Sequence, residues 1–214
     1  KETGWVPGFR LVSFLAAGEY NANYLVTGDL APCVLRINHG SQLGLGDRQI
    51  AYEYRVLKSL ESSGVTPKPL ACHPHPDPLG GGCLLMGFLP GKPLVYERDL
   101  ARAATIFARV HTIPVSPELN RDLIVQADPV RDIATESLGL IQRYPDHPME
   151  RERDLILSYR EKVRVLARET GELFAREKMC LVNTEVNSGN FLISDQGSFL
   201  VDWEKAVISF RYQD

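Results

Sequence analysis

The sequence predicts an α+β fold in which a small, antiparallel β-rich lobe is followed by a mostly helical lobe. Its first third alternates short apolar runs with turn residues, which is typical of a meander of strands. Around residue 47 the spacing of apolar residues changes to three or four, and helical patterns dominate beyond residue 89. With 214 residues, of which 44% are hydrophobic, the chain is long enough for two lobes. We expect them to span residues 1–88 and 89–214.

The first lobe is expected to hold five strands and one helix. The helix covers residues 47–60, where apolar side chains share one face, and Gly64 and Pro67 close it. A loop rich in Pro and Gly separates the last two strands. The strands are expected at residues 9–15, 24–27, 33–37, 69–71 and 83–88.

The second lobe is expected to begin with helices and to end with a hairpin. Asp128-Pro129 is typical of a helix start, and a long amphipathic helix covers residues 156–174. Strands at 191–193 and 199–201 flank a turn at Asp195-Gln196-Gly197. One face of the first helix is expected to carry Leu100, Ala104, Phe107 and His111. The chain starts with Lys1 and ends at Asp214 without a tapering polar tail, so we expect both ends to be trimmed.

Composition excludes several classes of partner. The formal net charge is -3 and Lys and Arg form no run, so nucleic acid is not expected as a partner. No apolar run approaches the ~20 residues that span a bilayer, so no membrane association is expected. The four cysteines lack CxxC spacing and are expected to be free thiols in a reducing cytoplasm. Cys72, His73 and His75 lie in a proline-rich loop and are not expected to bind zinc.

Two charged residues stand where apolar residues are expected. Arg36 lies inside an apolar strand, and Glu53 falls on the inner stripe of the helix that follows. Each would be costly to bury alone, whereas an ion pair with good geometry limits the desolvation penalty. The alternative is that both side chains extend to solvent.

The turn between the first two strands contains Gly18, where backbone amides could approach phosphate oxygens without obstruction by a side chain. An ordinary hairpin turn is the alternative. Neither a GxxxxGK[ST] loop nor a GxGxxG fingerprint occurs in the chain, which disfavours the nucleotide-binding folds that use them.

The C-terminal hairpin carries the strongest functional pattern. If the hairpin is symmetric about Gln196, Asn190 lies opposite Asp202 at its open end. An amide oxygen and a carboxylate are ligands that Mg²⁺ accepts together with nucleotide phosphates. Glu185, five residues before Asn190, could then reach a substrate hydroxyl held beside the metal. The alternative is an Asx-rich turn that caps a surface hairpin.

These segments, in order and approximate spacing, resemble the aminoglycoside phosphotransferase and choline kinase-like family. The resemblance covers about residues 9–214 and implies a bilobal, protein-kinase-like fold with an incomplete C-terminal lobe, because only twelve residues follow Asp202. The segments that carry it are residues 18–24, Arg36, Glu53, residues 84–91, Ala108-Arg109-Val110-His111, Asn190 and Asp202-Trp203-Glu204.

The resemblance also implies a role for each of these positions, with ATP and Mg²⁺ as cofactors. Gly18 and its neighbours, including Asn21, would cover the phosphates. Arg36 would bind the α- and β-phosphates, and Glu53 would orient Arg36. The stretch from Met86 to Leu89, which includes Phe88, would be the hinge that binds adenine. Asn190 and Asp202 would hold Mg²⁺, and Glu204 would assist at a second metal. His111 is expected to be a packed or capping histidine.

One departure from the family pattern concerns the catalytic loop. The family usually has His-Gly-Asp where this chain has Asn183-Thr184-Glu185, so Glu185 becomes the candidate base or orienter. The expected reaction moves the γ-phosphate of MgATP to a hydroxyl of a small molecule such as an aminoglycoside, an amino alcohol or a sugar. The alternative is a nucleotide-binding pseudokinase or regulatory module without phosphotransfer.

Overall fold

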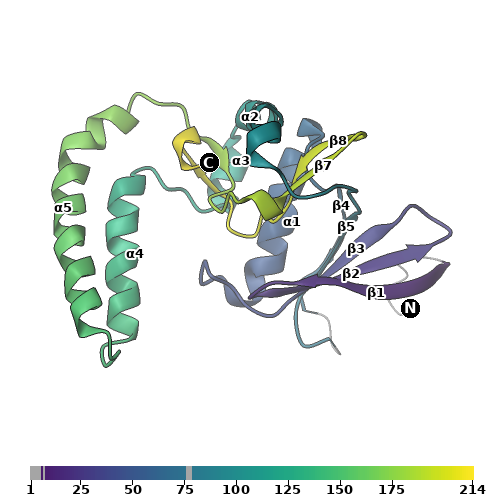
Figure 1. Cartoon of the computed structure of the whole chain (residues 1–214), viewed down its shortest axis with the longest axis horizontal. Helices are drawn as coiled ribbons and strands as arrows, with labels where there is room; N and C mark the ends of the chain where they lie inside the picture. Colours follow the sequence, from purple (N-terminus) through teal and green to yellow (C-terminus); the bar gives the residue numbers. More distant parts are fainter. Residues whose placement is uncertain (1–5, 7, 76–78) are drawn as a thin grey trace.

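A five-stranded antiparallel sheet forms the first part of the molecule (Figure 1). The computed structural model describes residues 6, 8–75 and 79–214. The strands are ordered β1-β2-β3-β5-β4. Their bounds are β1 Phe9–Ala17, β2 Asn21–Gly28, β3 Cys33–Asn38, β4 Pro69–His73 and β5 Cys83–Gly87. The five strands expected from the sequence are therefore confirmed.

Helix α1 (Gln49–Leu60) lies across this sheet and contributes Glu53 to the candidate site described below. Its buried side chains include Ile50, Leu57 and Leu60, as the spacing predicts. A short 3-10 turn follows at Glu61–Ser63, and Gly64 ends it with a φ of 68° that glycine adopts without strain.

Helices dominate the middle of the chain. They are α2 Tyr96–His111, α3 Pro117–Asp122, α4 Pro129–Arg143 and α5 Glu150–Phe174. The side chain of Asp128 caps α4 by accepting from the Arg131 N–H, which confirms the expected helix start.

The shared face expected for α2 is confirmed only in part, because Phe107 packs against the main core but the most buried residues lie one position earlier. Ala103, Ile106 and Val110 are buried, whereas Leu100 is 58% exposed. The buried face begins with Asp99, whose carboxylate accepts from the Val95 N–H at the helix start. Because the first residue of the buried face is charged, the spacing of apolar residues alone predicts a face that is displaced by one position.

Two short antiparallel ribbons build the site-bearing end of the chain. One pairs β6 (Cys180–Val182) with β9 (Val207–Ser209), and the other pairs β7 (Phe191–Ser194) with β8 (Gly197–Leu200). Leu192 pairs with Phe199, so the β7–β8 register differs by one residue from the one expected.

The main hydrophobic core is continuous between the two parts of the molecule. It joins residues of the sheet and α1, such as Val34 and Leu57, to Ile106, Trp203 and Ile208 farther along the chain. By contrast, α4 and α5 form a hairpin that stands apart from the rest (left in Figure 1). The proposed boundary at residues 88 and 89 stays a prediction. In the described ranges, no helix is long and apolar enough to cross a membrane.

Candidate functional site

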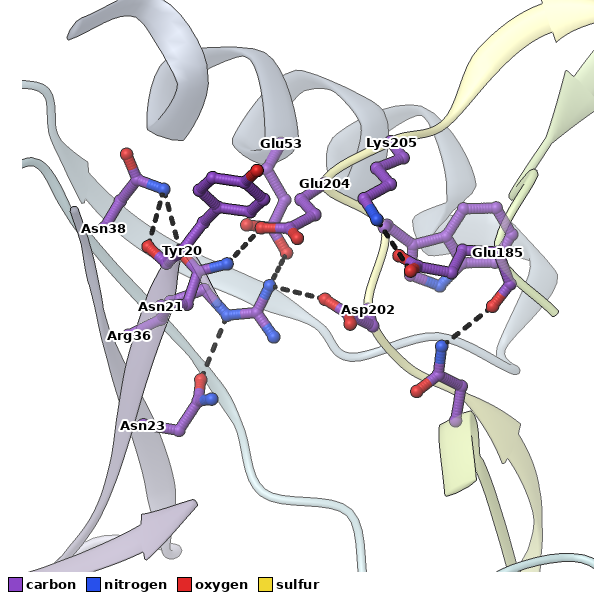
Figure 2. A network of polar contacts seen from close by, with 12 residues as sticks. Tyr20, Asn21, Asn23, Arg36, Asn38, Glu53, Glu185, Asp202, Glu204 and Lys205 are labelled. Atoms are coloured by element: carbon purple, nitrogen blue, oxygen red, sulfur yellow. Dashed lines mark hydrogen bonds and ion pairs between the residues drawn. The ribbon is translucent and has the colours of Figure 1, made fainter. Parts of the chain in front are cut away.

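Arg36 is the centre of the polar network that joins the sheet to the C-terminal ribbons (Figure 2). Strand β3 places it beside Asn23 of β2, and its Nε donates to Asn23 Oδ1 at 3.0 Å. Its Nη1 donates to Glu53 Oε1 at 2.6 Å and to Asp202 Oδ1 at 3.1 Å. The expected Arg36–Glu53 ion pair is present, and the alternative in which both side chains extend to solvent is wrong.

Both side chains of this ion pair are buried, so each charge has lost most of its hydration. The side chains of Arg36 and Glu53 are 7% and 2% exposed. Burial alone would lower the pKa of the guanidinium, but the carboxylates of Glu53, Asp202 and Glu204 outweigh it and raise that pKa. Burial raises the pKa of the Glu53 carboxyl, and the Arg36 charge opposes this rise. Arg36 is therefore held as a fixed cation that faces Asp202.

Three carboxylates converge beside Arg36. Glu185, Asp202 and Glu204 each offer an oxygen atom within 4.8 Å of the others. Glu204 is buried, accepts a hydrogen bond from Asn21 Nδ2 and lies close to Asp202 (Figure 2). Burial, followed by the charges of Asp202 and Glu53, raises the pKa of Glu204 to about 7. A divalent cation would relieve this repulsion, and carboxylate oxygens are the donors that Mg²⁺ prefers, so the residues present fit the metal.

Backbone strain marks two positions of the site. Thr184 and Asp202 both have a φ of 66°, which is uncommon for residues other than glycine. The loop holds them in place, since Asn183 Nδ2 donates to the Asp202 carbonyl at 2.8 Å and Thr184 Oγ1 donates to the Lys205 carbonyl at 2.9 Å. Such conformations persist at sites where the surrounding contacts fix them.

Asp214 holds the segment that leads to Glu185. Its Oδ1 accepts from the backbone N–H groups of Asn183 and Thr184 at 2.8 and 3.1 Å. Its Oδ2 lies 2.9 Å from Nε2 of His111, whose ring also stacks on Phe107. His111 is thus packed and hydrogen-bonded, in agreement with the expectation, whereas no local pattern in the sequence indicated a role for Asp214.

Lys205 is a second residue that sequence reasoning missed. Its Nζ donates to Glu185 Oε1 at 2.6 Å (Figure 2). The candidate base is therefore ion-paired, and Lys205 is a second cation in contact with one of the three carboxylates.

Asn190 does not pair with Asp202 as expected. The Val201 N–H donates to the Asn190 carbonyl at 2.9 Å, so Val201 lies opposite Asn190. The reason is the two-residue turn of the hairpin, in which Ser194 pairs with Gly197 and shifts the register by one. Asn190 Nδ2 donates to the Glu185 carbonyl at 2.9 Å, which leaves the side-chain oxygen as its atom for a cation.

The β1–β2 turn closes a polar pocket over the carboxylates. The pocket has a volume of about 180 Å³ and is lined by Gly18, Asn21, Glu185, Asp202 and Lys205, among others. A Cβ added at Gly18 would meet no atom within 4 Å, so the turn is open there. The Asn21 side chain is buried and is hydrogen-bonded to both Glu204 and Asn38, so it contributes to the walls of the pocket from within the polar network.

An apolar cavity of about 380 Å³ adjoins this polar pocket. Its lining combines Arg36, Glu53 and Asp202 with apolar side chains, namely Val34, Leu57, Met86, Leu192 and Val201. The Phe88 N–H, a candidate adenine contact, already donates to the Pro32 carbonyl at 3.1 Å. The Leu89 N–H donates to no acceptor among the described residues.

A zinc site at Cys72, His73 and His75 was not expected. Within the described part of the chain, Glu185, Asp202 and Glu204 are the only group of three or more such side chains that could hold a metal.

Comparisons with known proteins identify a family and several similar structures. A family model described as a phosphotransferase enzyme family matches residues 12–214. Aminoglycoside phosphotransferase APH(4)-Ia has a similar structure, with a TM-score of 0.70, 14% identity and coverage of 95% of this chain and 69% of that one. Choline kinase from Cryptosporidium parvum has a TM-score of 0.65 at 14% identity, and the match covers 94% of this chain and 60% of that one. No curated protein matches the sequence at a significant level.

A third similar structure is spectinomycin phosphotransferase APH(9)-Ia in complex with ADP and spectinomycin. Its TM-score is 0.59 at 11% identity, and 96% of this chain and 67% of that one are covered. The chain thus spans 60% to 69% of the length of these three structures. Since the family model covers nearly the whole chain and these structures share its kinase-like fold, the chain belongs to the phosphotransferase enzyme family.

Proposed function

We propose that the protein is an ATP-dependent phosphotransferase that moves the γ-phosphate of MgATP to a hydroxyl group of a small molecule. The observation that carries this proposal is the position of Arg36, which joins Glu53 to Asp202 between an apolar cavity and a cluster of carboxylates. A similar APH(4)-Ia structure is a ternary complex with AMP-PNP and hygromycin B, which supports nucleotide binding in this fold.

The two adjoining cavities suit the two ends of a nucleotide. Adenine would occupy the apolar cavity, where Met86 and Leu57 contact its faces. The Leu89 N–H, which has no acceptor among the described residues, would donate to a ring nitrogen. The phosphates would then lie beside Arg36 and under the Gly18 turn. Asp202, Asn190 and Glu204 would hold Mg²⁺, which neutralises charge on the phosphates when bound.

Glu185 is the proposed base or orienter. The acceptor hydroxyl enters the polar pocket, its proton passes to the Glu185 carboxylate, and its oxygen bonds to the γ-phosphorus as the bond to the ADP oxygen breaks. Aminoglycosides, amino alcohols and sugars are the acceptor classes, and their hydroxyl groups meet this requirement. The free cysteines agree with a reducing, cytoplasmic environment.

A pseudokinase or regulatory module is the second candidate. It is favoured by the Asn183-Thr184-Glu185 loop and by the ion pair that occupies Glu185. Such a protein would bind MgATP through Arg36 and Asp202 without transferring phosphate.

Turnover separates the two candidates. We expect the full-length protein to bind MgATP in calorimetry and to transfer phosphate to one member of a panel of hydroxyl acceptors, or slowly to water. Asp202→Ala should abolish transfer, and Glu185→Gln should reduce it by about a hundredfold. Asp154→Ala, an exposed carboxylate on α5, is the matched control and should change nothing. Unchanged activity in Asp202→Ala would refute the metal assignment, and tight MgATP binding without turnover would favour the pseudokinase.

A further inference from the structure

The Lys205–Glu185 ion pair belongs to the interior of the site. The Lys205 side chain is only 15% exposed, whereas that of Glu185 is 38% exposed. An exposed Lys–Glu pair contributes little, whereas solvent screens a largely buried ion pair much less. The pair lines the polar pocket together with Asp202 and Glu204.

The position of Lys205 is set independently of Glu185. Gln49 Nε2 donates to the Glu204 carbonyl at 2.7 Å, and Tyr52 Oη donates to the Ala206 carbonyl at 2.6 Å. Helix α1 therefore fixes the backbone on both sides of Lys205. The Thr184 hydroxyl bonds to the Lys205 carbonyl, which ties the same backbone to the residue before Glu185.

The two cations of the site have different partners. Arg36 contacts Asp202, whereas Lys205 contacts Glu185 (Figure 2). Since the three carboxylates lie within 4.8 Å of one another, a free Glu185 would compete for any cation held by Asp202 and Glu204. Glu is also one methylene longer than Asp, so its carboxylate needs a fixed partner to occupy one position.

We propose that Lys205 is a positioning residue for Glu185. Its ammonium group holds the longer carboxylate beside the acceptor hydroxyl and away from the cation bound by Asp202 and Glu204. This inference rests on the proposed phosphotransfer, and it explains how a glutamate serves at a position where the family usually has an aspartate.

The first test compares rate with nucleotide binding in the full-length protein. In Lys205→Met, kcat for transfer to the acceptor or to water should fall about ten- to a hundredfold, because Glu185 loses its position. KM for MgATP should change less than about twofold, since Lys205 does not line the apolar cavity. Lys205→Arg keeps a cation and should restore most of kcat.

The second test measures metal affinity without turnover. Removing a positive charge next to the carboxylates should make Mn²⁺ bind about three- to tenfold more tightly in the presence of ADP. Electron paramagnetic resonance of free Mn²⁺ measures this affinity. A merely structural role for Lys205 would lower rate and metal affinity together, whereas positioning lowers the rate and strengthens metal binding.

Controls separate this inference from the proposed function. Lys58→Met breaks a Lys58–Glu61 pair of 3.1 Å between the end of α1 and the turn that follows, and it should affect neither measurement. In the Glu185→Gln background, Lys205→Met should lower kcat little further, because the carboxylate that Lys205 positions is already absent. Full kcat in Lys205→Met, additive losses in the double variant, or weaker Mn²⁺ binding would each overturn the inference. Failure of the wild type to bind Mn²⁺ with ADP, or equal binding in Asp202→Ala, would instead overturn the proposed metal site.

Discussion

At the residue scale, Glu204 is an acidic side chain whose surroundings favour its protonated form. It is buried among carboxylates, and its pKa is raised to about 7 by burial first and by Asp202 and Glu53 next. In the unfolded chain a glutamate has a pKa of about 4.3. Between these two values the folded chain keeps a proton that the unfolded chain has released, so the free energy of unfolding falls as the pH rises.

We therefore predict that Glu204→Gln flattens the pH dependence of stability in the absence of divalent cations. The wild type should lose up to about 3 kcal/mol between pH 5 and pH 7.5 through this one group, and the variant should not. The glutamine keeps an oxygen that accepts from Asn21. Urea unfolding with a chelator at both pH values measures the difference. Glu61→Gln is the control, because Glu61 is paired with Lys58 and its pKa is lowered. Equal pH slopes in the wild type and Glu204→Gln would contradict the prediction.

At the scale of elements, the segment after β5 is fixed tightly to β7. Lys92 and Ile193 exchange two backbone hydrogen bonds, at 3.0 and 2.8 Å. A Cβ added at Gly91 would lie 2.7 Å from the carbonyl carbon of Leu192, closer than side chains tolerate. The glycine therefore permits the close approach of the two backbones beside the apolar cavity.

We predict that alanine at Gly91 affects mainly stability, whereas alanine at Gly18 affects mainly nucleotide binding. Gly91→Ala should destabilise the fold by about 1–3 kcal/mol, because backbone atoms must move apart. Gly18→Ala should change stability by less than about 0.5 kcal/mol, since the new Cβ meets nothing, yet it should weaken MgATP binding if the turn covers the phosphates. Urea unfolding and calorimetry give the two readouts. Unchanged nucleotide affinity in Gly18→Ala would remove this turn from the proposed phosphate site.

The elements that the sequence predicted well are those with a local signal. The five strands and α1 follow from alternation and spacing, and Arg36 and Glu53 were found because charged residues interrupt apolar faces. Strands β6 and β9 are three residues long and fully buried, so they show no alternation. Lys205 and Asp214 were missed because their partners, Glu185 and His111, lie 20 and 103 positions away.

At the scale of the whole molecule, the core and the α4–α5 hairpin differ in how they are held. The sheet, α1, α2 and the C-terminal ribbons share one hydrophobic cluster. Among the described side chains of α5 only Ala167 is buried, and α4 buries only Pro129 and Ala134. Large apolar side chains such as Ile156 and Leu166 are exposed on α5. The hairpin therefore gains little from burial in this 214-residue chain.

We predict that the α4–α5 hairpin opens independently of the core. A stacked contact of Phe174 with Phe210 at 4.9 Å joins the hairpin to the core, and a hydrogen bond from Arg160 Nε to the Ala134 carbonyl at 2.8 Å joins its two helices. In native-state hydrogen exchange of the 214-residue chain, the hairpin amides should exchange at least about a hundredfold faster than those of β6 and β9. Arg160→Met should further increase the exchange rate of the hairpin amides without changing the exchange rate of the core amides. Arg164→Met, which removes an exposed i,i+3 pair at 3.5 Å on the same helix, should not. Protection of the hairpin equal to that of β6 and β9 would mean that α4 and α5 unfold only together with the core.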